Sequence, residues 1–329
     1  MEQRTKIVID TKGGDKGAAV LVKGAALALE RFPQLALVLA GDAAQLGKEC
    51  EHLHVPVDRA EILDAPGEIT NYDDPAHTLY RKTDSSMLRS LEALASRDDL
   101  FGMITCGNTG VALTGAMRFL SGENPTRPAL AAVLPAETGG FTCLVDTGAT
   151  IDCTSAMLRH FAHLGSDFMR QMYGIENPKV GLLSNGAEPT KGNKLVKETH
   201  PLLAADGEVN FVGNVEGSDA LSGVCDVLVC DGFAGNQVLK VTEGTAKRMM
   251  TDIMRYAKKT GSADAEKLFF HLMGVYDIGS LGGGIILGVT KPVIKARGNA
   301  DERAVVSVAE MLLNMADHRA VFDRSRNHI

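Results

Sequence analysis

The chain has 329 residues, with 34 Lys and Arg against 41 Asp and Glu for a formal net charge of −7, and 45% of its residues are hydrophobic. Such a chain can bury a large core, and its acidic excess argues against a general nucleic-acid binder, which would carry a basic face. No apolar run reaches membrane-spanning length, and no basic segment followed by an apolar stretch marks a leader, so we expect a cytoplasmic protein.

Alternating strand-like and helix-like segments run through most of the chain. In chain order we predict a strand at 6–10, a helix at 18–31, strands at 35–40 and 61–64, a helix at 84–97, a strand at 100–105, a helix at 111–120, strands at 130–134 and 141–145, a helix at 155–173, a strand at 180–184, a helix at 192–204, strands at 210–212, 227–230 and 293–295, and a helix at 301–316.

This alternation predicts an α/β fold, in which helices cover both faces of a mostly parallel sheet. We expect one catalytic domain over residues 1–329, or two closely associated subdomains around a central cleft. In such sheets ligands bind beyond the carboxyl ends of the strands.

Residues 238–275 interrupt the alternation, because they are helical without a strand and break at Gly261-Ser262. We predict a helical hairpin inserted in the domain. Its first arm is basic, with Lys247, Arg248, Arg255, Lys258 and Lys259. Its second arm is apolar, with Leu268, Phe269, Phe270, Leu272, Met273 and Val275. The hairpin is either a dimer or core contact, or a docking site for an acidic carrier protein or an anionic membrane surface.

The six cysteines form no C-x-x-C pair, and three of them (Cys143, Cys225 and Cys230) lie in apolar segments, which favours reduced, buried thiols. The nine histidines show no H-E-x-x-H spacing. Asp226 and Asp231 flank a strand, where a structural role is favoured over metal binding. We therefore expect neither a metal nor a cofactor.

The segment around Cys106-Gly107-Asn108-Thr109-Gly110 leads from a buried strand into a helix. Strand, glycine loop and helix together point backbone N–H groups at an anion, and the helix dipole favours negative charge there. An ordinary strand-to-helix turn would give the same pattern. However, small polar or acidic residues with glycine follow several other predicted strands, which indicates close backbone approach around a small, anion-bearing ligand.

The usual fingerprints of other enzyme classes are absent: the chain has no Walker A motif, no G-x-G-x-x-G opening and no G-x-S-x-G elbow. Instead, an ordered set of short motifs spans residues 6–316. These are Asp10 with Gly13-Gly14-Asp15, Lys82 to Met87, Gly107 to Gly110, Arg127-Pro128-Ala129, Gly174 to Pro178, Lys191-Gly192-Asn193, Gly213 to Gly217, and Asp231-Gly232-Phe233 with Gly235-Asn236. In this order they resemble the acyl-ACP:phosphate acyltransferase family of bacterial phospholipid synthesis, of which the chain would be a divergent member.

The resemblance implies a fold similar to that of isocitrate and isopropylmalate dehydrogenases. It also implies a reaction in which inorganic phosphate attacks an acyl thioester, giving an acyl phosphate and free acyl carrier protein. No enzyme nucleophile and no metal are needed for that attack. A homodimer is implied as well, with peripheral association at the inner face of the membrane through the helical protrusion.

Two catalytic residues of the family match Lys191 and Asn236. An ammonium group suits phosphate, and a side-chain amide can donate to the oxyanion that develops on the thioester carbonyl. We expect phosphate to be bound by Gly13, Gly14, Gly107, Asn108, Thr109 and Gly110. Candidates for acyl or thioester contacts are Cys106, Asn185 and Gly186, and candidates for carrier or membrane docking are the five basic residues of the hairpin.

The chain departs from the family at Lys12, Cys106, Thr150 and Arg297, and in the Ser184-Asn185-Gly186 segment. These departures keep other readings open: a donor that is short acyl-CoA or another protein-bound thioester, or a non-catalytic paralogue that binds acyl-ACP or membrane. A dehydrogenase on the related fold is less attractive, because this chain has no dinucleotide fingerprint. Cys106 is either an acyl acceptor activated by the helix end or a small buried replacement for alanine.

Overall fold

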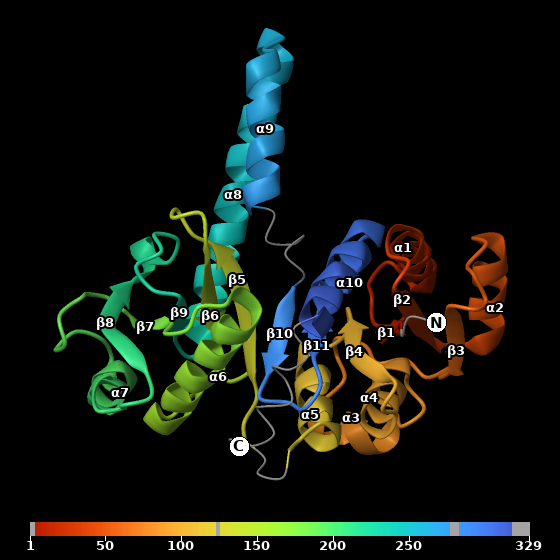
Figure 1. The fold of residues 1–329 in the computed structure, drawn as a ribbon, viewed down its shortest axis with the longest axis horizontal. Helices are drawn as coiled ribbons and strands as arrows, with labels where there is room; N and C mark the ends of the chain where they lie inside the picture. The colour runs from red at the N-terminus through yellow and green to blue at the C-terminus, as the bar shows by residue number, and fades with distance from the viewer. Residues whose placement is uncertain (1–3, 123–125, 277–282, 318–329) are drawn as a thin grey trace. The chain divides into compact units, whose positions relative to one another are not determined.

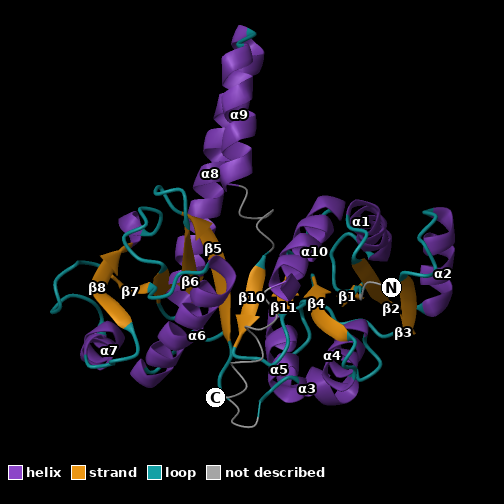
Figure 2. Cartoon of the chain, viewed as in Figure 1, coloured by secondary structure: helices purple, strands orange, loops and turns teal. Residues whose placement is uncertain are grey.

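The computed structural model describes residues 4–122, 126–276 and 283–317. These form two compact units, one made of residues 1–128 and 279–329 and the other of residues 129–278. In each unit helices cover a mostly parallel sheet (Figures 1 and 2). The predicted α/β class is therefore confirmed.

The sheet of the first unit has the order β3-β2-β1-β4-β11-β10. Its strands are β1 (Thr5–Asp10), β2 (Leu35–Gly41), β3 (Ala60–Asp64), β4 (Leu100–Thr105), β10 (Gly284–Leu287) and β11 (Val293–Lys295). All neighbours pair in parallel except β10 and β11. The central strands are buried on both faces, which explains why they read as continuous apolar runs.

The helices described in the first unit are α1 (Ala18–Arg31), α2 (Ala43–His52), α3 (Pro75–Arg81), α4 (Ser86–Ser96), α5 (Thr109–Phe119) and α10 (Glu302–Asp317). α1 and α10 lie on one side of the sheet and α3, α4 and α5 on the other (Figure 1). α1 and α10 approach closely at Gly24, where a Cβ would lie 2.6 Å from Cβ of Val305.

The sheet of the second unit has the order β5-β6-β9-β7-β8. Its strands are β5 (Ala129–Pro135), β6 (Phe141–Val145), β7 (Lys179–Ser184), β8 (Asn210–Glu216) and β9 (Val227–Val229). Only β5 and β6 pair in an antiparallel way. α6 (Ser155–Tyr173) and α7 (Lys194–Ala204) follow β6 and β7. α6 approaches the sheet at Gly165, where a Cβ would lie 2.5 Å from the Val227 side chain.

The predicted helical hairpin consists of α8 (Gly232–Thr260) and α9 (Ala263–Tyr276), which pack side by side and extend away from the sheet of their unit (Figure 1). The first turns of α8 are anchored, because Ala234, Val238 and Leu239 pack against buried residues of the sheet. Gly261 ends α8 in the left-handed region, at φ 65°. None of the described helices is both long and apolar enough to cross a membrane.

Candidate active site

A buried carboxylate organises the carboxyl end of β1. The Asp10 residue is only 1% exposed, and its side chain accepts hydrogen bonds from the Ser86 hydroxyl and, at 2.7 Å, from Thr105 Oγ1. Burial raises the pKa of Asp10, while these hydroxyls and the backbone N–H groups of Lys12 and Gly13 act in the opposite direction. Asp10 thus ties the loop after β1 to the end of β4 and the start of α4.

The loops after β1 and β4 approach so closely that glycine is required. A Cβ on Gly13 would lie 2.7 Å from the backbone nitrogen of Gly107 and 2.9 Å from its Cα. Gly14 leaves more room, since a Cβ there would lie 3.6 Å from Cβ of Cys106. Four of the predicted phosphate-site residues, Gly13, Gly14, Gly107 and the following Asn108, are therefore neighbours in space. The Gly13 N–H, however, is directed at the Asp10 carboxylate.

Asn108 is the N-cap of α5, and its side chain is fully engaged within the protein. Its Oδ1 accepts from Val111 N–H at 3.1 Å, and its Nδ2 donates to the carbonyls of Thr70 and Asp73 at 3.1 and 3.2 Å. The next two backbone N–H groups, of Thr109 and Gly110, open α5 and have no acceptor among the described residues. These two amides are the groups of the predicted phosphate loop that remain available to an anion.

Cys106 lies directly before this loop and is 2% exposed. Burial, reinforced by the nearby Asp10 carboxylate, raises the pKa of its thiol to about 12. At neutral pH the thiol is therefore protonated, because burial disfavours the thiolate. This environment favours the interpretation of Cys106 as a small buried residue.

Three departures from the family pattern occupy the same edge of the first sheet. The Lys12 ammonium donates to the Pro66 carbonyl. Cys106 lies against Gly14. Arg297 precedes Gly298, whose carbonyl accepts from Asp15 N–H at 2.8 Å. The fourth, Thr150, belongs to the second unit.

In the second unit, the loop between β7 and α7 holds three predicted site residues: Asn185, Gly186 and Lys191. Asn185 Oδ1 accepts from Gly192 N–H at 2.8 Å, and a Cβ on Gly186 would lie 2.8 Å from Cγ of Lys191. Lys191 is exposed, and its ammonium has no partner in the described part of the chain. Asn185 and Gly186 therefore shape the loop that presents Lys191.

A further polar pair supports this loop and was not predicted from the sequence. Asn214 on β8 donates from Nδ2 to the Glu188 carbonyl at 2.9 Å, and its Oδ1 lies 3.0 Å from Nδ1 of His200. One indication of a role for Asn214 was present in the sequence, namely its position in the Gly213 to Gly217 motif. Its partners come from other segments of the chain and could not be read from spacing.

The start of α8, which carries Asn236, is fixed by a second buried carboxylate, Asp146. Its side chain accepts from the backbone N–H groups of Leu130, Gly148, Ala149 and Thr150 at 2.7 to 3.2 Å. The Thr150 carbonyl in turn accepts from Gly232 N–H at 2.8 Å, and a Cβ on Gly235 would lie only 1.9 Å from the Asp146 carbonyl oxygen.

Asn236 lies in the second turn of α8 and is partly buried, and its amide has no hydrogen-bond partner among the residues described. Because β6, β9 and β7 are parallel neighbours, the loops that follow them lie at one edge of the sheet. The structure therefore places Lys191 and Asn236, the two predicted catalytic residues, at the same edge of the second unit.

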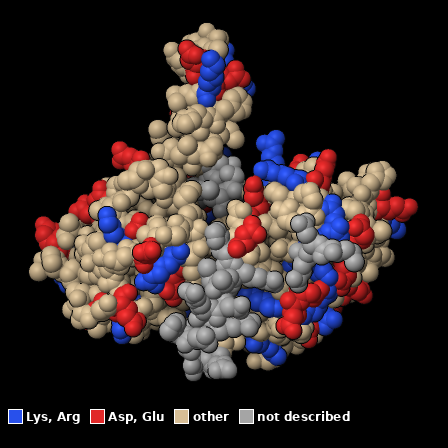
Figure 3. Space-filling model, in the orientation of Figure 1, with Lys and Arg blue, Asp and Glu red and all other residues tan. Residues whose placement is uncertain are grey.

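The five predicted docking residues on α8 are all exposed, but their charges are not equally available. Arg248 and Arg255 form ion pairs with Asp252 at 2.8 and 3.0 Å, whereas Lys247, Lys258 and Lys259 have no ion pair among the described residues. Both signs of charge are visible near the end of the hairpin (Figure 3). Large exposed apolar side chains of the hairpin are Phe233, Val241, Met249, Tyr256, Leu268, Phe270 and Val275.

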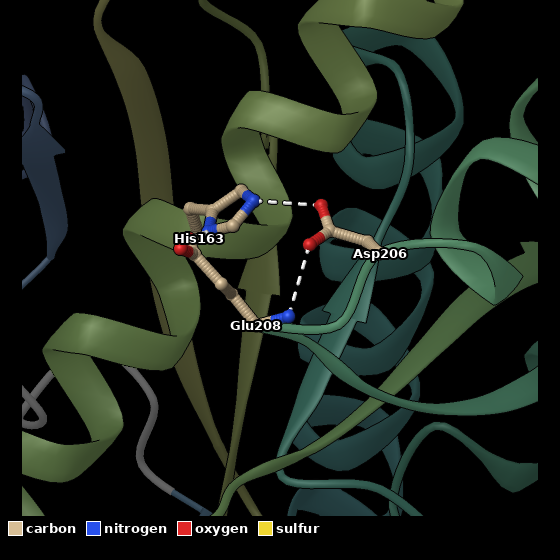
Figure 4. A group of neighbouring side chains, drawn as sticks. All are labelled: His163, Asp206 and Glu208. Carbon is tan, nitrogen blue, oxygen red and sulfur yellow. Dashed lines mark hydrogen bonds and ion pairs between the residues drawn. The ribbon is translucent and has the colours of Figure 1, made fainter.

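Away from these loops, His163, Asp206 and Glu208 gather three groups of the kind that bind metal ions (Figure 4). Asp206 Oδ2, however, already accepts from Arg159 Nε at 2.6 Å and lies 2.8 Å from His163 Nε2. Burial would raise the pKa of Asp206, but Arg159, the Glu208 N–H and His163 together lower it to about 2. The guanidinium supplies the positive charge, so this cluster is an ion-pair network that anchors α6.

Comparison with known proteins agrees with the sequence motifs. Residues 5–320 match the family described as fatty acid synthesis protein. A phosphate acyltransferase from Halothermothrix orenii is 38% identical over 94% of this chain and 95% of its own length. A phosphate acyltransferase from Clostridium novyi is 34% identical over 98% of both chains.

Among solved structures, a phosphotransacetylase from Streptococcus pyogenes superposes with a TM-score of 0.63 at 15% identity, covering 97% of this chain and 95% of its own. That likeness extends only to the fold. The two relatives are similar in sequence along nearly their whole length, and the chain therefore belongs to the phosphate acyltransferase family.

Proposed function

We propose that this acyltransferase takes its acyl group from acyl carrier protein and passes it to inorganic phosphate in fatty acid and phospholipid synthesis. The observation that carries the proposal is that Lys191 Nζ and Asn236 Nδ2, neither of which has a hydrogen-bond partner among the described residues, lie at one edge of the sheet. Asn236 is the more telling of the two, because a partly buried amide with a purely structural role would normally have an acceptor nearby.

The residues suit direct attack by phosphate. The Thr109 and Gly110 amides at the start of α5 are suited to phosphate oxygens, and the Lys191 ammonium balances the negative charge of the reacting groups. Asn236 is suited to donate to the oxyanion as the carbonyl becomes tetrahedral. The bond from a phosphate oxygen to the acyl carbon is what makes the carbonyl tetrahedral. As the C=O bond re-forms from the oxyanion, the C–S bond breaks and its electron pair leaves on the sulfur of the carrier thiolate.

The hairpin is our proposed contact for large partners. Lys247, Lys258 and Lys259 have no ion pair within the described residues, and they offer positive charge to an acidic carrier protein or to the inner membrane surface. The exposed apolar side chains of α8 and α9 favour a homodimer contact or insertion into the lipid interface. We place the working protein in the cytoplasm, peripheral to the membrane.

The deciding experiment incubates the purified protein with phosphate and a panel of acyl-ACP and acyl-CoA donors, and measures acyl phosphate. We expect turnover with acyl-ACP and losses of about 100-fold or more in Lys191→Ala and Asn236→Ala, the scale for one oxyanion donor. Lys194→Ala is the matched control, because Lys194 is an exposed lysine three residues away that only faces Glu198 at 3.8 Å. Full activity of Lys191→Ala would refute the assignment.

The same panel separates the alternatives. Faster turnover with short acyl-CoA would identify the other donor, for which the fold shared with phosphotransacetylases is the supporting observation. Binding of acyl-ACP without any acyl phosphate would identify a non-catalytic paralogue.

A further inference from the structure

The two units repeat one arrangement at the ends of a parallel strand pair. In the first unit, Asp10 ends β1 and lies beside Thr105 of β4. In the second unit, Asp146 follows β6, and its backbone N–H donates to the carbonyl of Cys230, which follows β9, at 3.0 Å. Both carboxylates are buried and accept N–H groups from the loop that follows them.

In each unit, glycines also mark the close approach between the loop after the carboxylate and the start of a helix. A Cβ on Gly13 would lie 2.7 Å from the nitrogen of Gly107, and a Cβ on Gly232 would lie 3.0 Å from Cα of Gly148. In each unit the loop held by the carboxylate therefore touches a glycine beside the N-cap of a helix: Gly107 directly precedes the cap of α5, and Gly232 directly follows the cap of α8. The helix is then capped by the side chain of Asn108 for α5 and of Asp231 for α8.

Each of these helix starts carries a group that we assign to the reaction. α5 opens with the Thr109 and Gly110 amides, and α8 carries Asn236 in its second turn. A carboxylate can accept several N–H groups at once, whereas a carboxamide presents an NH2 donor toward some of them. Loss of the carboxylate would therefore shift the loop and, through the glycine contact, the helix start.

We propose that Asp10 and Asp146 are positioning residues with separate tasks: Asp10 sets the amides of α5 for phosphate, and Asp146 sets Asn236 of α8 for the oxyanion. This inference rests on the proposed function. Neither carboxylate touches the reacting atoms, and each acts through the loop and the glycine contact that it holds.

The test compares Asp10→Asn, Asp146→Asn and a control, Asp206→Asn, by steady-state kinetics with phosphate varied. The control removes a buried, ion-paired carboxylate that lies outside both helix starts. We expect Asp10→Asn to raise the KM for phosphate about 10-fold or more with kcat little changed, since a misplacement of about 1 Å is worth up to about 100-fold. We expect Asp146→Asn to lower kcat by a similar factor with the phosphate KM retained.

Two further variants, which leave both carboxylates in place, keep the test open if a carboxylate variant does not fold. Ser86→Ala removes one donor to Asp10, and Gly232→Ala places a methyl group 2.8 Å from Asp146 Oδ2. The inference would be overturned if Asp10→Asn and Asp146→Asn each changed the phosphate KM and kcat by equal factors. It would also be overturned if Asp206→Asn changed one of these constants selectively, as expected for Asp10→Asn or Asp146→Asn. In either case the wild-type activity would still support the proposed function. A wild-type protein that forms no acyl phosphate from any donor would refute both.

Discussion

Gly13→Ala tests whether the contact between the loops after β1 and β4 is as close as the structure indicates. The added methyl carbon would lie 2.5 Å from Asp10 Oδ2 and 2.7 Å from the nitrogen of Gly107. Neither atom is the free end of a flexible side chain, because the carboxylate is held by its donors and Gly107 follows directly from β4. The loop must therefore move, and overpacking of this kind costs about 1–3 kcal/mol.

Thermal unfolding and phosphate kinetics measure the two consequences. For a unit of this size, each kcal/mol of lost unfolding free energy lowers the melting temperature by about 2–4 °C, so we expect it to fall by several degrees. We also expect a higher KM for phosphate, because the displaced loop carries the start of α5 with it. Gly47→Ala in α2 is the control, since a Cβ there meets no atom within 4 Å. A Gly13→Ala protein with the wild-type melting temperature and phosphate KM would refute the close-contact argument.

Three further predictions follow from the environments of single side chains. Cys106→Ala should keep its turnover within about 2-fold, because a buried thiol with a pKa of about 12 supplies almost no thiolate at neutral pH; an acyl–Cys106 adduct found by mass spectrometry would contradict this. The lowered pKa of Asp206 should make stability fall as the pH drops from about 4 to about 2, when the native carboxylate is protonated and its Arg159 partner is lost. Urea unfolding of wild type and Asp206→Asn should converge at the low end of that range, and a constant difference across it would argue against the ion pair. Because Arg159 is half exposed, solvent screening limits the difference in unfolding free energy at pH 7. Charge reversal by Lys258→Glu with Lys259→Glu should raise the KM for acyl-ACP about 5-fold or more at low salt. The control reverses Arg248 and Arg255, which are already paired with Asp252, and we expect it to raise the KM less. Equal effects of the two double variants would argue against docking through the lysines.

Hydrophobic patterning predicted most elements, because their apolar faces are buried by neighbours in the same unit. The helix predicted at 155–173 agrees with α6, and the predicted strands at 141–145 and 293–295 agree with β6 and β11. α2 was missed because Leu46 is its only fully buried residue, which leaves no apolar stripe to detect. β10 was missed as well, since its four residues are too few to establish an alternation.

The sequence motifs predicted which residues belong to the candidate site, but not the contacts that hold them. Glycines and the two catalytic candidates could be found from the sequence, but the role of Asp10 could not. Its hydroxyl partners, Ser86 and Thr105, lie 76 and 95 residues further along the chain. Such bonds depend on strand order and register, which a single sequence does not specify. The contacts of Asn108 could not be predicted for the same reason. The sequence suggested it as a phosphate donor, whereas its side-chain amide donates to the carbonyls of Thr70 and Asp73.

Asn108 also determines how binding at the start of α5 should respond to temperature. With one side chain it caps the helix and holds the 70–73 segment, so the loop is ordered before any anion arrives. The conformational entropy of this loop is lost during folding and not during ligand capture. Calorimetric titration with phosphate should therefore show only a small heat-capacity change, and Asn108→Ala should shift the entropy of binding toward more unfavourable values.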